Sequence, residues 1–270
     1  MRIVDVADHS LSSLLLTRVK AYSDLIKLRL SALVTFSAVF GFILGDRGVS
    51  FGWTGFLGLA LGGFLISGAS GAANEIMERD LDKLMKRTQN RPLPLQIISL
   101  QEAYWFTSLV AFSGIFLLWF FTNPLTTWLG ILSMVLYVFA YTPLKRVGPI
   151  AVFVGAIPGA MPPLLGWTAA TGEITYEALI IFGIQFIWQF PHFWAIAWVS
   201  DEDYKRAGFK LLPSGGGQDL NTAIQIMIYT LFLLPLGLLP SYFGLTGLNS
   251  GIVATICGVL FLAQTFSLMR

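Results

Sequence analysis

Residues 53–91 read WTGFLGLALGGFLISGASGAANEIMERDLDKLMKRTQNR, and this stretch joins an apolar run to a densely charged segment. The run from Trp53 to Ile76 contains Glu75 as its single charged residue. An α-helix needs about 20 mostly apolar residues to cross the hydrocarbon core of a membrane. The stretch therefore predicts a transmembrane helix that delivers acids and bases to one edge of the bilayer.

Similar apolar runs occur along the whole chain of 270 residues, of which 55% are hydrophobic and only 12% charged. Soluble domains carry about 25% charged residues. No run alternates with a period of two, so a membrane β-barrel is not expected. We expect an all-α fold, a polytopic transmembrane bundle of about eight helices, over residues 30–45, 53–76, 103–121, 125–141, 147–168, 178–198, 223–242 and 251–268.

The basic residues indicate how these helices are oriented. The N-terminal segment, the loops after the second, fourth and sixth helices and the C-terminal residue together hold 16 of the 17 Lys and Arg residues, and Arg47 is the exception. Lys and Arg near helix ends mark the cytoplasmic side. Both termini are therefore expected in the cytoplasm of a bacterial plasma membrane, with the mitochondrial inner membrane as the alternative. No basic stripe suggests nucleic-acid binding.

The residues after the second expected helix, which we name the first acidic segment (residues 74–91), have helical spacing. Asn74, Glu78 and Asp82 recur every fourth position and so share one helix face. Carboxylates at this spacing repel one another. Their oxygens suit Mg²⁺, which takes one or two carboxylates together with substrate phosphates. The segment predicts a metal site, although a solvated charged loop is the alternative.

Basic residues directly follow these acids. Lys86, Arg87 and Arg91 are suited to holding the phosphates of the same substrate. Tyr141 and Lys145 also suit phosphate oxygens and share a face if the fourth helix continues past Pro143. Taken alone, this pair is equally typical of a membrane interface.

A second acidic segment, residues 201–213, repeats the order of acids, bases and a Leu-Pro pair four helices later. Asp201, Glu202 and Asp203 precede Lys205 and Lys210, and the residue pattern does not choose between the three acids as ligands. The repeat suggests two related four-helix halves around a central cavity. Transporters also have such repeats, but they place charges near the midplane of the membrane. Charges at one interface favour an enzyme that acts on an amphiphile.

The first acidic segment, with Arg-Thr-x-Asn-Arg-Pro after it, resembles the first motif of the UbiA superfamily of intramembrane prenyltransferases. Further segments resemble the haem O synthases (protoheme IX farnesyltransferases) in the same order, from about Lys27 to Pro213. These segments are residues 85–93 (MKRTQNRPL), 141–145 (YTPLK), 155–163 (GAIPGAMPP), 188–194 (WQFPHFW) and 203–213 (DYKRAGFKLLP).

The resemblance implies a farnesyl diphosphate donor, protoheme IX as acceptor, haem O as product and Mg²⁺ as cofactor. It also implies a single intramembrane domain over residues 1–270. Its parts are an interfacial or cytoplasmic segment at 1–28 and motif loops at 77–100 and 199–220. Members usually have nine transmembrane helices, one more than this sequence shows. Association with membrane lipid is expected, and the resemblance leaves room for partners among haem-pathway or oxidase-assembly proteins.

Residue roles carry over with the motifs. Asn74, Glu78 and Asp82 would bind Mg²⁺ and diphosphate, with Asp80 assisting. Asp203 and Asp201 would serve the second motif. Tyr141, Lys145, Arg87 and Arg91 would hold or activate the diphosphate, with Lys205 and Lys210 among the bases.

The acceptor site is expected near the sixth helix. His192 would ligate or orient the haem iron; alternatively it belongs to a hydrogen-bond network with Gln185 and Gln189. Nearby aromatic side chains are candidates to line an allylic cation, and these are Phe186, Trp188, Phe190, Phe193 and Trp194. The alternative acceptors are a quinone precursor or chlorophyllide, and the rival from another class is a transporter with an acidic gate.

Overall fold

The computed structural model describes residues 11–46, 52–214 and 217–269, and these residues form helices joined by short loops. Eight spans are long and apolar enough to cross a membrane, as the sequence predicted. They are α2 (Leu28–Gly45), α3 (Trp53–Asp82), α4 (Leu100–Phe121), α5 with η1 and α6 (Pro124–Leu144), α7 (Ile150–Thr171), α8 (Tyr176–Val199), α10 (Leu220–Tyr242) and α11 with η2 (Leu248–Leu268). The chain is an integral membrane protein. Arg47, which the charge analysis used, lies outside the described residues.

Two boundaries differ from those expected in a way that matters for the site. Helix α3 continues to Asp82, so residues 77–82 are helical and the first motif loop starts at Lys83 rather than at 77. The charged end of α3 stays helical because most of its polar side chains find partners from other segments. The second motif loop, expected at 199–220, contains the short helix α9 (Asp201–Arg206) before α10 begins at Leu220.

Close packing of α2 against α7 rests on glycines. A Cβ atom on Gly166 of α7 would stand 1.8 Å from the Ala38 carbonyl oxygen of α2, and one on Gly41 would stand 2.1 Å from the Pro163 carbonyl oxygen. Small residues let transmembrane backbones approach one another in this way.

Helix α7 contains Pro162 and Pro163, which lack the N–H groups that would bond the carbonyls of Pro158 and Gly159. Both freed carbonyls accept side-chain donors from neighbouring helices. Ser133 Oγ donates to the Pro158 oxygen at 3.5 Å, and Gln189 Nε2 donates to the Gly159 oxygen at 2.9 Å. A polar side chain inside a transmembrane helix is costly unless it is paired. Gln189 is therefore explained by the backbone of α7.

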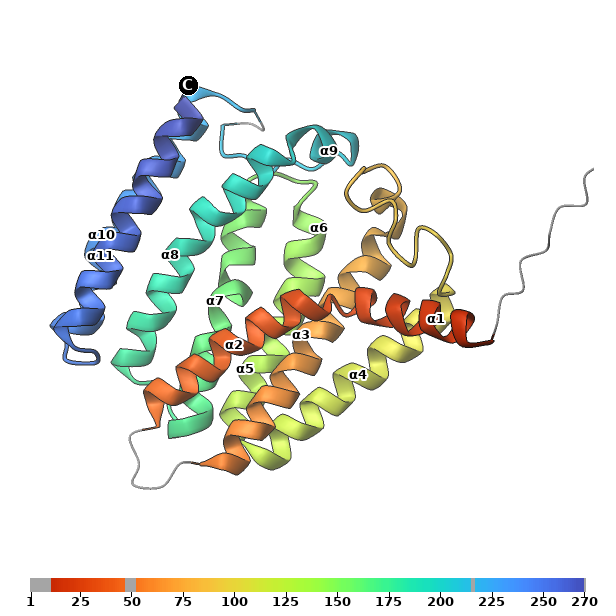
Figure 1. Cartoon of the computed structure of the whole chain (residues 1–270), viewed down its shortest axis with the longest axis horizontal. Helices are drawn as coiled ribbons and strands as arrows, with labels where there is room; N and C mark the ends of the chain where they lie inside the picture. Colours follow the sequence, from red (N-terminus) through yellow and green to blue (C-terminus); the bar gives the residue numbers. More distant parts are fainter. Residues whose placement is uncertain (1–10, 47–51, 215–216, 270) are drawn as a thin grey trace, which may run out of the picture.

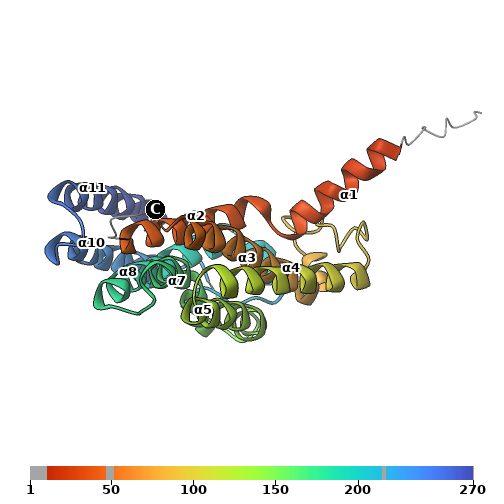
Figure 2. The same ribbon diagram turned by 90° about the horizontal axis from the view of Figure 1, so that it is seen from below.

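The arrangement gathers the two acidic segments at one end of the bundle. Figure 1 shows α9, α6 and the loop after α3 together at that end, whereas the α4–α5, α7–α8 and α10–α11 turns lie at the other. Helix α1 (Leu11–Leu25) leaves the bundle at an angle, as Figure 2 shows, and only its last turns pack, through Ala21 and Leu25. Its exposed leucines suit the interfacial position predicted for this segment.

Candidate active site

The end of α3 buries a row of polar side chains. Asn74, Glu78 and Asp82 are at most 5% exposed, as is Glu75, which lies beside them. The spacing predicted one shared helix face for the first three, and the structure turns that face inward. Buried carboxylates need positively charged partners or a metal ion. The residues that pair with these carboxylates therefore belong to the site.

Arg91 supplies one partner by folding back over the end of α3. Its Nη1 atom donates to both carboxylate oxygens of Asp82, at 2.8 and 3.0 Å, and its Nε atom lies 3.5 Å from Glu75 Oε1. Thr88 Oγ1 donates to the Asp82 carbonyl at 3.0 Å and fixes the turn between them. The basic part of the first acidic segment therefore pairs with its own acids.

Lys145 supplies the second partner from the fourth span. Its Nζ atom lies 2.9 and 3.0 Å from the two carboxylate oxygens of Glu78 and 4.9 Å from the centre of the Tyr141 ring. The helix does continue past Pro143, through the π-helical turn η1 (Leu136–Tyr141) into α6 (Thr142–Leu144). Tyr141 and Lys145 consequently share a face, as the sequence analysis required.

Lys27 supplies the third partner, and it was not among the predicted site residues. It stands between α1 and α2 with a left-handed backbone (φ 50°), and its Nζ donates to Asn74 Oδ1 at 3.1 Å and lies 3.9 Å from Glu75 Oε1. A non-glycine residue in this conformation is uncommon and often marks a functional position. Glu75 was missed too, although a charge inside an apolar span is itself a functional signal.

These six ionisable groups balance one another in charge. Three carboxylates (Glu75, Glu78 and Asp82) face three cations (Lys27, Arg91 and Lys145). Burial lowers the pKa of Lys27 to about 8, with nearby Arg91 acting in the same direction. Burial also lowers the pKa of Lys145, although Glu78 opposes that change. The cluster is a concentrated, water-poor set of charges at the membrane edge.

The donor chemistry fits a hard cation bound together with an anion. Glu75 Oε2 is buried and has no hydrogen-bond partner among the described residues, so the cluster keeps unused acceptor capacity. No three His, Cys, Asp or Glu side chains within 11–46, 52–214 and 217–269 stand as a metal-binding group. A magnesium ion here would therefore share its coordination with substrate phosphate, which is its usual habit.

Asp80 lies apart from this cluster, contrary to its predicted supporting role. Its side chain is 66% exposed and pairs with Lys83 at 3.0 Å and Arg79 at 3.5 Å. The reason is helical geometry, because a residue two positions from Glu78 and from Asp82 projects to another side of α3.

The second acidic segment is paired differently. Asp201 pairs with Lys205 one turn away at 2.7 Å, and the Glu202 side chain is 89% exposed. Both oxygens of Asp203 accept backbone N–H groups of the first segment, from Lys86 and from Arg87, each at 3.1 Å. Among the described residues, no ion pair joins these acids to the cations of the buried cluster. Predicted site residues Lys205 and Lys210 are exposed as well.

Aromatic and apolar side chains extend from the cluster toward α8. The Tyr141 ring contacts the Phe193 ring at 5.7 Å, and His192 stacks on Trp188 at 4.4 Å and contacts Phe193 at 5.9 Å. Ring contacts through Phe193 and Tyr141 therefore link His192 to Lys145. The Nε2 atom of Gln189, which the sequence suggested as a hydrogen-bond partner of His192, donates to the Gly159 carbonyl of α7 instead.

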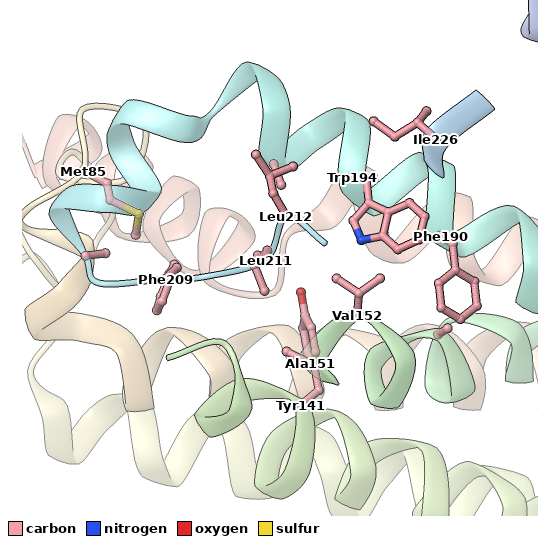
Figure 3. Packing of buried hydrophobic residues seen from close by; sticks show 13 residues of the cluster. Met85, Tyr141, Ala151, Val152, Phe190, Trp194, Phe209, Leu211, Leu212 and Ile226 are labelled. Atoms are coloured by element: carbon pink, nitrogen blue, oxygen red, sulfur yellow. The ribbon is translucent and has the colours of Figure 1, made fainter. Parts of the chain in front are cut away.

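A buried apolar cluster ties the two motif segments together behind these rings. Figure 3 shows Met85 of the first segment and Phe209, Leu211 and Leu212 of the second converging with Tyr141. Phe190 and Trp194 of α8 complete the cluster, and the Trp194 Nε1 atom has no hydrogen-bond partner among the described residues. The predicted aromatic lining is in part this packed core.

One surface hollow lies away from these charges. It is on the outer face of α4 and is lined almost entirely by apolar residues between Phe112 and Phe120. Such a surface faces lipid in a membrane protein. The buried charges, rather than this hollow, therefore mark the candidate active site.

The UbiA prenyltransferase family model matches residues 34–270. The protoheme IX farnesyltransferase of Cytophaga hutchinsonii is 49% identical over 251 residues, which are 93% of this chain and 87% of that protein. That of Christiangramia forsetii is 44% identical over 92% of this chain and 83% of its own length.

Solved structures show the same fold. A UbiA homolog from Archaeoglobus fulgidus bound to DMAPP and Mg²⁺ has a TM-score of 0.69 at 16% identity, covering 91% of this chain and 85% of its own. A structure of a digeranylgeranylglyceryl phosphate synthase has a TM-score of 0.76 at 19% identity, covering 94% and 88%.

Proposed function

The chain belongs to the UbiA prenyltransferase family, and we propose that it transfers the farnesyl group of farnesyl diphosphate to a vinyl group of protoheme IX, giving haem O. The observation that carries the proposal is the buried set of three carboxylates and three cations at one end of the bundle. The acceptor follows from the curated relatives, which are protoheme IX farnesyltransferases.

The diphosphate would be held by Lys27, Arg91 and Lys145, whose positive charges converge on α3. Asn74, Glu78 and Asp82 would hold Mg²⁺, which supplies charge stabilisation to a leaving diphosphate when bound. Without substrate, each cation pairs with a carboxylate. On binding, Lys27, Arg91 and Lys145 would turn to the diphosphate oxygens, and the carboxylates would turn to Mg²⁺, so the site would stay close to neutral. Preformed charges of this kind stabilise developing negative charge without reorganising water.

The reaction would begin when the C1–O bond of farnesyl diphosphate breaks and the diphosphate keeps the electron pair. The farnesyl cation would then attack the vinyl carbon–carbon bond, and water would add to the resulting cation and lose a proton. The rings of Tyr141 and Phe193 lie next to Lys145, and aromatic faces stabilise a cation. They would accommodate the allylic carbons beside the diphosphate site.

His192 would orient protoheme IX beside this region. It stacks on Trp188 and contacts Phe193, whose ring contacts Tyr141. Phe193 therefore lies between His192 and the rings that would line the allylic cation. The diphosphate head would arrive from the cytoplasm, the side on which the distribution of basic residues predicts both termini. The farnesyl tail would remain in lipid.

The test is a reconstituted reaction with purified protein in detergent. Protoheme IX, farnesyl diphosphate and Mg²⁺ should yield a heavier and more apolar haem, identified by chromatography and mass spectrometry. EDTA should abolish the product and added Mg²⁺ should restore it. Transfer to 4-hydroxybenzoate, with none to protoheme IX, would overturn the acceptor but retain the ionisation.

A variant separates the proposed role of His192 from that of the charge cluster. His192→Ala should keep farnesyl diphosphate binding, measured with a labelled substrate, while transfer to protoheme IX falls. A wild-type transfer rate in this variant would remove His192 from the acceptor site.

A further inference from the structure

Asp203 accepts hydrogen bonds with both of its carboxylate oxygens. Oδ1 accepts the Lys86 N–H and Oδ2 the Arg87 N–H, each at 3.1 Å, and Oδ1 also lies 3.2 Å from Arg206 Nη1. Burial alone would raise the pKa of Asp203, but the backbone donors of Arg87 and Lys86, together with the positive charges of Arg206 and Lys86, lower the pKa overall. Oδ1 thus accepts two hydrogen bonds and Oδ2 one, and the two backbone donors hold the carboxylate against the 83–91 loop, away from the cations of the buried cluster.

The loop that Asp203 holds is the part of the first acidic segment that carries Arg91. Between Lys83 and Arg91 the chain is attached to α3 by Thr88 and Arg91, which bond Asp82, and to the second acidic segment by Asp203. Met85 of this loop belongs to the same buried apolar cluster as Phe209 and Leu211 of the second acidic segment. Asp203 therefore acts on the outer side of a loop whose inner side reaches the cluster.

The second acidic segment is itself anchored on two sides. The Lys210 N–H donates to the Lys145 carbonyl at 2.9 Å, so the chain after α9 also holds the residue that pairs with Glu78. Gly208 has a positive φ of 73°, and the Phe209 N–H donates to the Tyr204 carbonyl at 2.8 Å, which ends α9 and turns Phe209 inward. Helix α9 thus bridges the Arg91 loop and the Lys145 turn.

We infer that Asp203 is a positioning residue, which fastens the 83–91 loop to α9 so that Arg91 faces the diphosphate, and is not a magnesium ligand. Only the effect on catalysis rests on the proposed function. The fastening itself is a property of the protein without substrate. Its matched control is Glu202, the neighbouring acid, whose exposed side chain lies 3.8 Å from Arg206.

The first experiment measures hydrogen exchange by mass spectrometry in peptides that cover residues 83–91 of the full chain in detergent. Asp203→Ala should increase deuterium uptake there, Asp203→Asn, which keeps one acceptor oxygen, should give an intermediate increase, and Glu202→Gln should match wild type. Unchanged uptake in a folded Asp203→Ala protein would overturn the inference. Asp203→Asn carries the same test if the alanine variant does not fold.

The second experiment separates positioning from metal binding by kinetics. In Asp203→Asn, the KM for farnesyl diphosphate should rise about tenfold, the loss expected for a charged hydrogen bond, while the Mg²⁺ concentration for half-maximal rate stays unchanged. A large rise in that Mg²⁺ requirement with an unchanged KM would make Asp203 a ligand and overturn the inference. If the wild-type chain shows no farnesyl transfer, the proposed function fails, whereas the exchange experiment still decides the fastening.

Discussion

The two acidic segments contain the same kinds of residues in the same order, yet they pair their charges in opposite ways. Glu75, Glu78 and Asp82 of the first segment are buried and pair with Lys27 and Lys145 from other segments and with Arg91, which folds back from the end of the same segment. The second segment pairs Asp201 within one helical turn and binds backbone with Asp203. The comparison teaches that a repeated motif does not imply a repeated role.

The difference follows from where each segment stands in the fold. Helix α3 has 30 residues and packs against α2, α4 and α7, so its last turns remain inside the bundle. Helix α9 has six residues and lies across the end of the bundle. An ion pair out of water interacts strongly, whereas an exposed pair contributes little. Among the acids of the second segment only Asp201 is buried, and its partner Lys205 is exposed, so the charge chemistry is assigned to the first segment.

The largest effect is expected from Asp82→Asn, which removes a fully buried charge but keeps its shape. Turnover of farnesyl diphosphate should fall by about 10²–10³-fold, the loss typical of removing one preorganised charge contact. Turnover is measured with labelled substrate at equal amounts of folded protein. Glu173→Gln, an exposed acid at the other end of the bundle, is the control. Equal losses in both variants would indicate instability rather than a site.

An effect of comparable size, on stability, is expected at Glu78 and Lys145. Lys145→Met leaves the Glu78 carboxylate buried and unpaired, which should cost about 3–5 kcal/mol of unfolding free energy. The double variant Glu78→Met/Lys145→Met should recover most of that loss, because no charge then stays buried alone. Denaturant titration in detergent measures both. A double variant as unstable as the single one would contradict the buried-pair interpretation.

Asp201→Asn should have a smaller effect. Its partner Lys205 is 60% exposed, so turnover should fall by no more than about fivefold, as for a surface ion pair. The assay is the one used for Asp82→Asn. A loss as large as that of Asp82→Asn would bring the second segment into the charged site and end the contrast between the segments.

The smallest effect is expected from cysteines that only report position. With Cys257 replaced by Ala, Lys83→Cys, Glu202→Cys and Glu173→Cys place single thiols on exposed loops or helix ends. An impermeant maleimide should label Cys at 173 in intact cells, and should label 83 and 202 only in inverted vesicles. Activity should be retained. Labelling of positions 83 and 202 from opposite sides of the membrane would contradict the placement of both acidic segments at one end of the bundle.

Local patterns in the sequence were enough for the spans and for the principal row of site residues. Eight apolar runs of membrane length are confirmed as eight helices. The shared face of Asn74, Glu78 and Asp82 follows from a helical period alone, and so does the proximity of Tyr141 and Lys145. Asp80 received its supporting role from the family resemblance, whereas its spacing places it on another side of α3, where it is exposed and pairs with Lys83.

The membrane fold, the family resemblance and the side chains that α3 presents can be derived from the sequence, because length, hydropathy and helical period act between near neighbours. The cations that those side chains meet depend on the tertiary structure. Lys27 reaches Asn74 across 47 positions, Lys145 reaches Glu78 across 67 and Asp203 reaches Lys86 across 117. Such partners depend on how helices pack and loops return, which no local spacing encodes.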